Sequence, residues 1–115
     1  EEINRLHTRS PLAKLRIFVC SPFSGTDRTR NVLKAIEYTK RVIKMGHAPF
    51  TPHLFYPQFL DDNNAKEREI GIAAGLTFLA ICDAVWVFGR KITKGMQGEI
   101  KLAKQLKIPI KRFGA

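Results

Sequence analysis

A glutamate near two glycines is the feature of this sequence best placed to do chemistry. The apolar run at 84–88 ends at Gly89, and a short polar loop leads to Gly95 and Met96. Glu99 then falls in the first turn of a helix expected from about Met96. In an open α/β sheet, ligands bind in the crevice beyond the carboxyl ends of the strands, where a carboxylate can act on a small molecule. The alternative is that Glu99 only stabilises the helix N-terminus, by about 0.3–1 kcal/mol.

The turn after the first predicted strand is a second candidate. It consists of Ser21, Pro22, Phe23, Ser24 and Gly25, and it leads into a predicted helix. Backbone N–H groups at such a helix start, together with hydroxyl groups, are suited to holding a phosphate. The turn matches neither the dinucleotide-binding glycine pattern nor the P-loop pattern. The sequence leaves two interpretations open, a phosphate-binding turn and an ordinary strand-to-helix turn.

A third loop brings a histidine, and the helix after it brings acids. His53 follows Pro52, and it is either a ligand contact or a hydrogen-bonded structural residue. Glu67, Arg68 and Glu69 lie in the first turns of the next predicted helix. Most of this charge is expected in solvent. One acid facing the site would nevertheless complete a carboxylate pair, which divides the nucleophile and acid or base roles at a sugar carbon.

The elements that must position these loops alternate along the chain. Strands are predicted at 15–20, 48–51, 84–88 and 108–113, and helices at 26–45, 65–81 and 96–106. Segment 52–57 is expected to be a loop. This order predicts right-handed crossovers and a mostly parallel sheet with helices on both faces. Two apolar helix faces are predicted from spacing: Ile70, Ala73, Ala74, Thr77, Phe78 and Ile81 in one helix, and Ile100, Ala103 and Leu106 in another.

Composition narrows the class of protein. The 115 residues suit one domain, which we place at 15–115 behind an N-terminal arm at 1–14. No apolar run reaches the roughly 20 residues of a membrane span, and no signal-peptide pattern opens the chain. We expect a cytoplasmic protein without a membrane partner, in which Cys20 and Cys82 stay reduced.

The net charge of +10 raises the question of nucleic acid. The basic residues are scattered over predicted helix faces, without the aromatic-interleaved pattern of a nucleic-acid surface. A small phosphorylated substrate suits this basic field better. A nucleic-acid-binding module remains the weaker alternative.

In their order and spacing, these motifs resemble the nucleoside 2-deoxyribosyltransferase superfamily, especially its small DUF4406-type branch in bacteria and phages. The resemblance runs from Ile17 to Ile110 and is carried by residues 17–25, 46–54, 82–89, 95–100 and 108–110. It implies a flavodoxin-like α/β fold with an open, mostly parallel sheet of four to five strands. It also implies cleavage of an N-glycosidic bond in a nucleoside or nucleotide.

The resemblance further implies roles for individual residues. Glu99 matches the nucleophile that attacks the anomeric carbon and forms a covalent glycosyl–enzyme intermediate. No aspartate aligns with the acid that protonates the leaving base, so Glu69 is the candidate and Asp83 a weaker one. The contacts expected to bind the sugar or 5′-phosphate are Ser21, Phe23, Ser24 and Gly25, and the further substrate contacts predicted are His53, Gly89, Gly95 and Met96.

Several points of the activity stay open at this stage. Residues 90–94 lack an acid that some transferases carry before the glycine, which slightly favours a hydrolase or a pure binder over a transferase. We expect no metal and no other cofactor, because displacement at an anomeric carbon needs a carboxylate and an acid. A homo-oligomer is expected from the relatives. The alternative function is a non-catalytic protein that sequesters a nucleotide signal.

Overall fold

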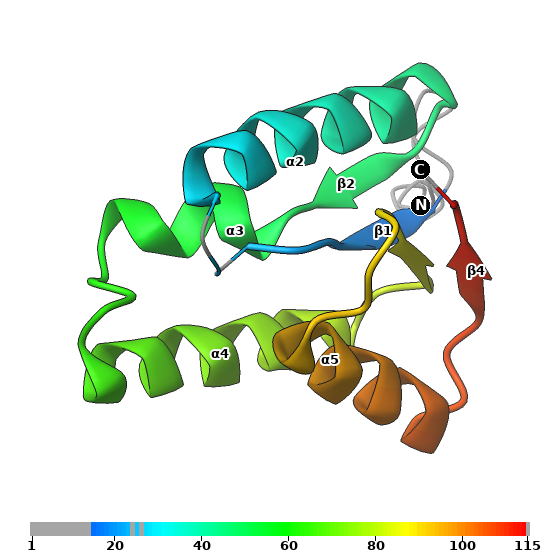
Figure 1. The fold of residues 1–115 in the computed structure, drawn as a ribbon. Coiled ribbons are helices and arrows are strands. Elements are labelled where there is room, and N and C mark those ends of the chain that lie inside the picture. Colours follow the sequence, from blue (N-terminus) through cyan, green and yellow to red (C-terminus); the bar gives the residue numbers. More distant parts are fainter. Residues whose placement is uncertain (1–14, 24, 26, 115) are drawn as a thin grey trace, which may run out of the picture.

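A four-stranded parallel sheet forms the centre of the molecule (Figure 1). The computed structural model describes residues 15–23, 25 and 27–114. The strand order is β2-β1-β3-β4, and the strands are β1 (Arg16–Cys20), β2 (Ala48–Phe50), β3 (Ala84–Val87) and β4 (Ile110–Arg112). The fold is the predicted α/β, flavodoxin-like arrangement, with four strands.

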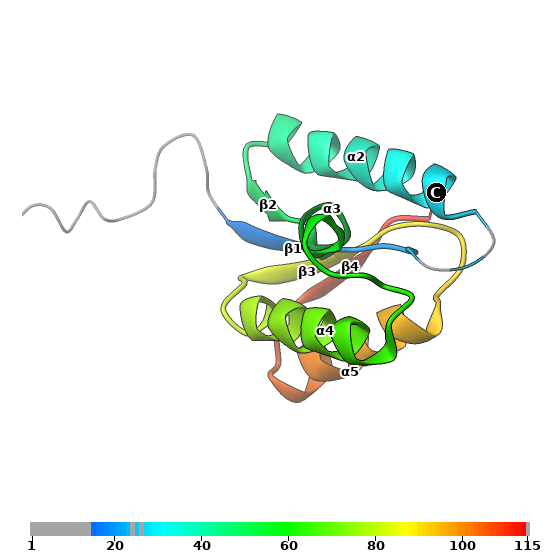
Figure 2. The same cartoon turned by 90° about the vertical axis from the view of Figure 1, so that its left-hand side faces the viewer.

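Helices cover both faces of this sheet (Figure 2). Helix α2 lies on one face, and α4 and α5 lie on the other. The bounds are α2 (Arg28–Lys44), α3 (Pro52–Phe55), the 3₁₀ turn η1 (Tyr56–Gln58), α4 (Ala65–Leu79) and α5 (Lys94–Gln105). Within the described ranges, no helix is both long enough and apolar enough to cross a membrane.

The central strands are buried on both faces, which explains their unbroken apolar runs. From β1, Ile17 and Val19 pack toward α2, in a cluster with Tyr38. Phe18 and Cys20 point to the opposite face and pack with residues of α4 and α5. The end of β1 therefore carries a cysteine directly beneath the helices that line the site.

Helix α2 was predicted at 26–45, and the structure confirms both ends to within two residues. The Asp27 carboxylate caps it by accepting a hydrogen bond from the Arg30 N–H at 3.3 Å. The chain leaves the helix through Gly46, whose φ of 87° is a conformation that favours glycine. Ala35 and Val42 are buried, whereas Ile43 is 57% exposed.

Segment 52–57 is helical, so the predicted loop is wrong. Pro52 occupies the first turn of α3, where its fixed φ suits the helix and its missing N–H costs nothing. The Leu54 N–H donates to the Thr51 carbonyl at 3.0 Å. The aromatic run is thus a pair of short helical turns that pack against the rest of the domain.

The apolar face predicted for α4 is also wrong. Ile70, Phe78 and Ile81 are between 45% and 56% exposed. The buried residues are Gly75 and Leu79. A Cβ at Gly75 would lie 3.5 Å from the Pro52 Cβ, an ordinary van der Waals distance, so α3 packs directly on this side of α4. Apolar residues occur around most of this helix, and tertiary contact selected the face with the glycine.

Helix α5 begins earlier than predicted. The Thr93 Oγ1 accepts a hydrogen bond from the Met96 N–H at 3.3 Å, which makes Thr93 the cap and Lys94 the first helical residue. Glu99 therefore lies in the second turn rather than the first, where a dipole effect is weaker. Ala103 is buried and Ile100 packs against the core, but Leu106 is 46% exposed.

Candidate active site

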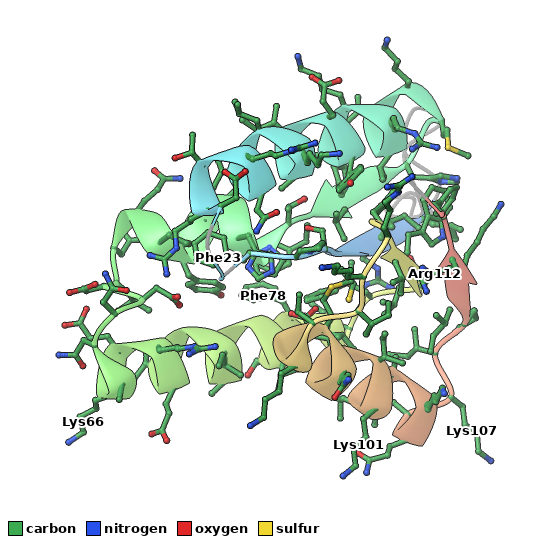
Figure 3. The ribbon with its side chains drawn as sticks, in the orientation of Figure 1. Phe23, Lys66, Phe78, Lys101, Lys107 and Arg112 are labelled. Atoms are coloured by element: carbon green, nitrogen blue, oxygen red, sulfur yellow. The ribbon has the colours of Figure 1, made fainter. Side chains whose placement is uncertain are left out.

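A cavity opens between the turn after β1, the short helices α3 and η1, helix α4 and the start of α5. Its volume is about 120 Å³, several times the roughly 10–15 Å³ that one water needs. Phe23 and Glu99 both line it, so the turn after β1 and the catalytic candidate meet there. Figure 3 shows Phe23 in the space between α2 and α4, whereas Lys66, Lys101 and Lys107 project away from the sheet.

Glu99 supplies the carboxyl group at the floor of this cavity. The residue as a whole is half-buried, but its Oε1 is buried and has no hydrogen-bond partner among the described residues. Burial raises the pKa of Glu99 from 4.5 to about 7, and a side-chain hydrogen bond with Cys20 opposes that rise. A buried polar atom without a partner costs free energy, and Oε1 is such an atom on a residue that lines the cavity.

His53 and Phe23 form one wall. Their rings stack with centroids 4.8 Å apart and 18° between the planes. The His53 Nε2–H donates a hydrogen bond to the Ser21 carbonyl at 2.8 Å. Burial lowers the pKa of His53 to about 4, so the ring is neutral at pH 7. The turn after β1 therefore contacts the His53 ring twice, through the Ser21 carbonyl and through the Phe23 ring.

Charged groups gather at another edge of the cavity. Asp62, Glu67 and Arg68 line it. The Asp62 carboxylate accepts a hydrogen bond from the Arg28 Nη2 at 3.2 Å and lies 4.0 Å from the Arg68 Nε. The Arg28 guanidinium also lies over the Phe23 ring, 5.1 Å from its centroid. Two guanidinium groups thus share the Asp62 carboxylate, and with Glu67 the formal charges at this edge balance.

The structure brings together about half of the predicted site residues. Those that line the cavity are Phe23, His53, Gly95, Met96 and Glu99. Ser21 adjoins it through the carbonyl bonded to His53, and its hydroxyl is buried without a partner among the described residues. Ser24 lies outside the described residues.

Two predicted glycines do not line the cavity. Gly25 is exposed, with a φ of 129° and no atom within 4 Å of the position of a Cβ. Gly89 has a φ of 100°, and a Cβ there would lie 3.1 Å from the Pro22 Cδ. Gly89 therefore lets the chain turn closely against Pro22, which is a packing role.

Glu69 is exposed on α4 and does not line the cavity. Its neighbour Glu67 does, and one Glu67 oxygen accepts a hydrogen bond from the Asp61 N–H at 2.7 Å. Asp83, the weaker candidate, instead binds Arg16 at the start of β1. The Asp83 carboxylate accepts hydrogen bonds from the Arg16 backbone N–H at 2.7 Å and from the Arg16 guanidinium at 3.0 Å.

Sequence reasoning missed several residues at the site. They are Arg28, Asp62, Glu67, Arg68 and the thiol of Cys20. One signal was present for α4. Gly71 and Gly75 mark the packed side of the helix, and one turn before Gly71 on that side is Glu67. For Cys20 and Arg28 no local signal existed, because their contacts join distant segments.

In chemical terms, the cavity combines a carboxyl group with a raised pKa, a flat aromatic wall and a charged edge. These features suit a small molecule with a ring and polar substituents. Within residues 15–23, 25 and 27–114, no three His, Cys, Asp or Glu side chains form a group that would hold a metal ion.

Comparisons with known proteins agree with this picture at the level of the fold. A family model described as a domain of unknown function, DUF7768, matches residues 15–113. Among curated proteins no sequence matches the chain. A solved 2-deoxyribosyltransferase from the psychrotolerant bacterium Bacillus psychrosaccharolyticus is similar in structure, with a TM-score of 0.69 and 17% sequence identity. The similarity covers 86% of this chain and 72% of that enzyme.

Proposed function

The chain belongs to the DUF7768 family, a domain of unknown function, and we propose that it cleaves the N-glycosidic bond of a nucleoside or nucleotide. The observation that carries this proposal is the Glu99 carboxyl group, which lines the cavity with a buried oxygen that has no partner among the described residues. The structural similarity to a 2-deoxyribosyltransferase supports the choice of substrate. We retain the DUF4406-type resemblance as a prediction.

The proposed reaction begins with attack of a Glu99 carboxylate oxygen on the anomeric carbon of the sugar. The new O–C bond forms as the C–N bond breaks, and the electron pair of that bond leaves with the base. Water or a second base then resolves the ester, which makes the protein a hydrolase or a transferase. Attack requires the ionised carboxylate, and a pKa of about 7 leaves roughly half of Glu99 ionised at neutral pH. Positive charge developing on the sugar favours that ionised form.

The leaving base needs a proton, and we assign this role to Glu67 in place of Glu69. Glu67 lines the cavity, whereas Glu69 is exposed to solvent. Asp62 also lines the cavity, but two guanidinium groups already engage its carboxylate. Glu67 accepts one backbone hydrogen bond from Asp61, which fixes its position at the cavity edge.

The rest of the cavity accounts for binding. We propose that Phe23 and His53 contact the sugar or base, and that Gly95 and Met96 shape the wall beside Glu99. We propose that the guanidinium groups of Arg28 and Arg68 bind a phosphate of the substrate, so we favour a 2′-deoxynucleotide. We further propose a homo-oligomer in the cytoplasm, where Cys20 and Cys82, both free thiols, stay reduced.

A second candidate function is a binder that holds a nucleotide in the same cavity without cleaving it. The raised pKa of Glu99 favours this reading, since a protonated carboxyl group donates a hydrogen bond to a ligand and does not attack it. The two functions share one site and differ only in turnover.

The test is incubation with a panel of nucleosides and 5′-nucleotides, with chromatography for the released base. Thermal melting with each compound runs in parallel. Released base supports the glycosidic function. A raised melting temperature without released base supports the binder. If no compound produces released base or a raised melting temperature, both functions are overturned.

A further inference from the structure

His53 has two ring nitrogens, and they are placed differently in the structure. Nε2 lies 2.8 Å from the Ser21 carbonyl oxygen. A carbonyl oxygen only accepts hydrogen bonds, so in the neutral ring the hydrogen is on Nε2 and the lone pair is on Nδ1. Nδ1 has no hydrogen-bond partner among the described residues, and it is not one of the fully buried polar atoms that lack a partner. Because the ring lines the cavity, a ligand there can reach this lone pair.

The surroundings of His53 keep its ring neutral. Among the described residues, no ion pair involves His53, and burial lowers the pKa of the ring to about 4. A neutral ring with its hydrogen on Nε2 is an acceptor at Nδ1, whereas a charged ring would donate from both nitrogens. At pH 7 the cavity therefore has a hydrogen-bond acceptor on this wall.

Two contacts with the turn after β1 fix the direction of this acceptor. The Phe23 ring stacks on the His53 ring, with centroids 4.8 Å apart. The hydrogen bond to Ser21, which is 0% exposed, sets the rotation of the imidazole within that stack. A ligand therefore meets an acceptor that is already oriented, which reduces the entropy lost on binding.

We propose that the His53 Nδ1 accepts a hydrogen bond from a neutral O–H or N–H group of the ligand, and that His53 thereby helps to select the substrate. The choice of a nucleotide as that ligand rests on the proposed function. In 2′-deoxyadenosine 5′-phosphate, two groups have this chemistry, the 3′-hydroxyl of the sugar and the amino group of the base. An ionised phosphate oxygen only accepts, so it cannot bind the same lone pair. His53 therefore orients the neutral part of the nucleotide towards α3, with the phosphate towards Arg28 and Arg68.

The first measurement is nitrogen NMR of the histidine rings, which distinguishes a protonated ring nitrogen from an unprotonated one. The protein is Glu99→Gln, so that the probe, 2′-deoxyadenosine 5′-phosphate, is not cleaved, and the His53 signals are assigned by their loss in the added change His53→Gln. We expect a protonated Nε2 and an unprotonated Nδ1 in the free protein at pH 7. The probe should shift the Nδ1 signal.

Two analogues of the probe identify the donor. One lacks the 3′-hydroxyl, and the other has a hydrogen in place of the amino group of the base. At least one of them should leave the Nδ1 signal of His53 unshifted, and the group that it lacks is the donor. This comparison needs no change at His53, so it does not depend on the folding of a His53 variant.

The second measurement is binding of the probe and of the analogue without the donor to variants of His53. Gln places its amide nitrogen near the position of Nε2 and keeps a donor for Ser21, whereas Asn places its carbonyl oxygen near the position of Nδ1. The unchanged ring should prefer the probe by about tenfold, the effect of one hydrogen bond. His53→Gln should lose this preference, and His53→Asn should keep it. His47→Gln is the matched control, because the His47 ring packs on Trp86 with centroids 5.4 Å apart and does not line the cavity.

Several results would overturn the proposal. They are a ring protonated on Nδ1 in the free protein, an Nδ1 signal that does not respond to the probe, and an equal response to the probe and both analogues. A preference for the probe that survives His53→Gln, or that both His53 variants lose, overturns it as well.

Base release by the wild type separates this proposal from the proposed function. If the Nδ1 signal responds to the probe as expected and no base is released, the role of His53 stands and the glycosidic function falls. If base is released and the Nδ1 signal does not respond, the glycosidic function stands and the role of His53 falls.

Discussion

Glu99 and His53 line the same cavity from different elements, and burial shifts their pKa values in opposite directions. Glu99 comes from α5, and burial raises its pKa to about 7. His53 comes from α3, and burial lowers its pKa to about 4. Both shifts favour the neutral form, because a low-dielectric surrounding penalises charge on either group.

The hydrogen bonds of the two residues differ more than their burial does. His53 donates to the Ser21 carbonyl and stacks on Phe23, so the described structure already engages its ring. Glu99, in contrast, has a buried Oε1 without a hydrogen-bond partner among the described residues. Similar burial therefore leaves the His53 ring engaged by Ser21 and Phe23, and it leaves one Glu99 oxygen without a described partner. The following predictions test this contrast.

The largest expected effect is on turnover in Glu99→Gln. The amide keeps the size of the side chain but removes the charge that attacks the sugar, so base release should fall by several orders of magnitude. Chromatography of released base measures it, and melting at pH 5 checks that the fold is intact. Similar release by both proteins would mean that Glu99 is not the nucleophile.

The same variant should change how stability depends on pH. Because the pKa of Glu99 is raised in the folded state, the native protein binds more protons than the unfolded chain between pH 4.5 and about 7. Stability from this group is therefore present below pH 4.5 and is lost as pH rises through about 7. Glu99→Gln should gain on the wild type across that range, by up to about 3 kcal/mol. Denaturant unfolding at several pH values measures the difference, and a constant gap would contradict the buried carboxyl group.

The contribution of His53 to folding stability should depend on pH in the opposite sense, over a lower pH range. Its pKa is lowered in the folded state, so its contribution is present above pH 6.5 and is lost as pH falls through about 4. In the Glu99→Gln background, which removes the opposing slope, stability should fall with acidification by up to about 3 kcal/mol. The added change His53→Gln should flatten that fall. An unchanged slope would show that His53 is accessible to solvent.

The smallest effect is expected at the charged edge. Arg28→Gln removes the 3.2 Å ion pair with Asp62. The Arg28 side chain is 38% exposed and the Asp62 side chain 21% exposed. Solvent screening limits the loss to about 1 kcal/mol or less, and added salt should reduce it further. Lys40→Gln is the matched control, since its 3.9 Å pair with Glu37 is at least 63% exposed and should contribute almost nothing. A loss at Arg28 that is insensitive to salt would indicate packing on Phe23 instead.

Sequence patterns were sufficient for the order of the elements because those patterns are local. Strand β1 and helix α2 were predicted to within two residues, since an apolar run and an Asp27 cap act over short distances. Patterns failed for the orientation of α4, where apolar residues occur around most of the helix. They also chose Glu69 over Glu67, and two residues along a helix turn a side chain to another face.

By itself, the sequence determined an alternating α/β chain, a carboxylate after the third strand, and a turn after the first strand that would share one edge of a parallel sheet. Tertiary structure decided which acids line the cavity, that α5 begins at Lys94, and that Cys20 packs against Met96 and Ala103 of α5. The physical reason is distance along the chain. Propensity and capping act within a few residues, whereas packing at the site brings the end of β1 against α5. The burial that results raises the pKa of Glu99 and leaves its Oε1 without a partner among the described residues.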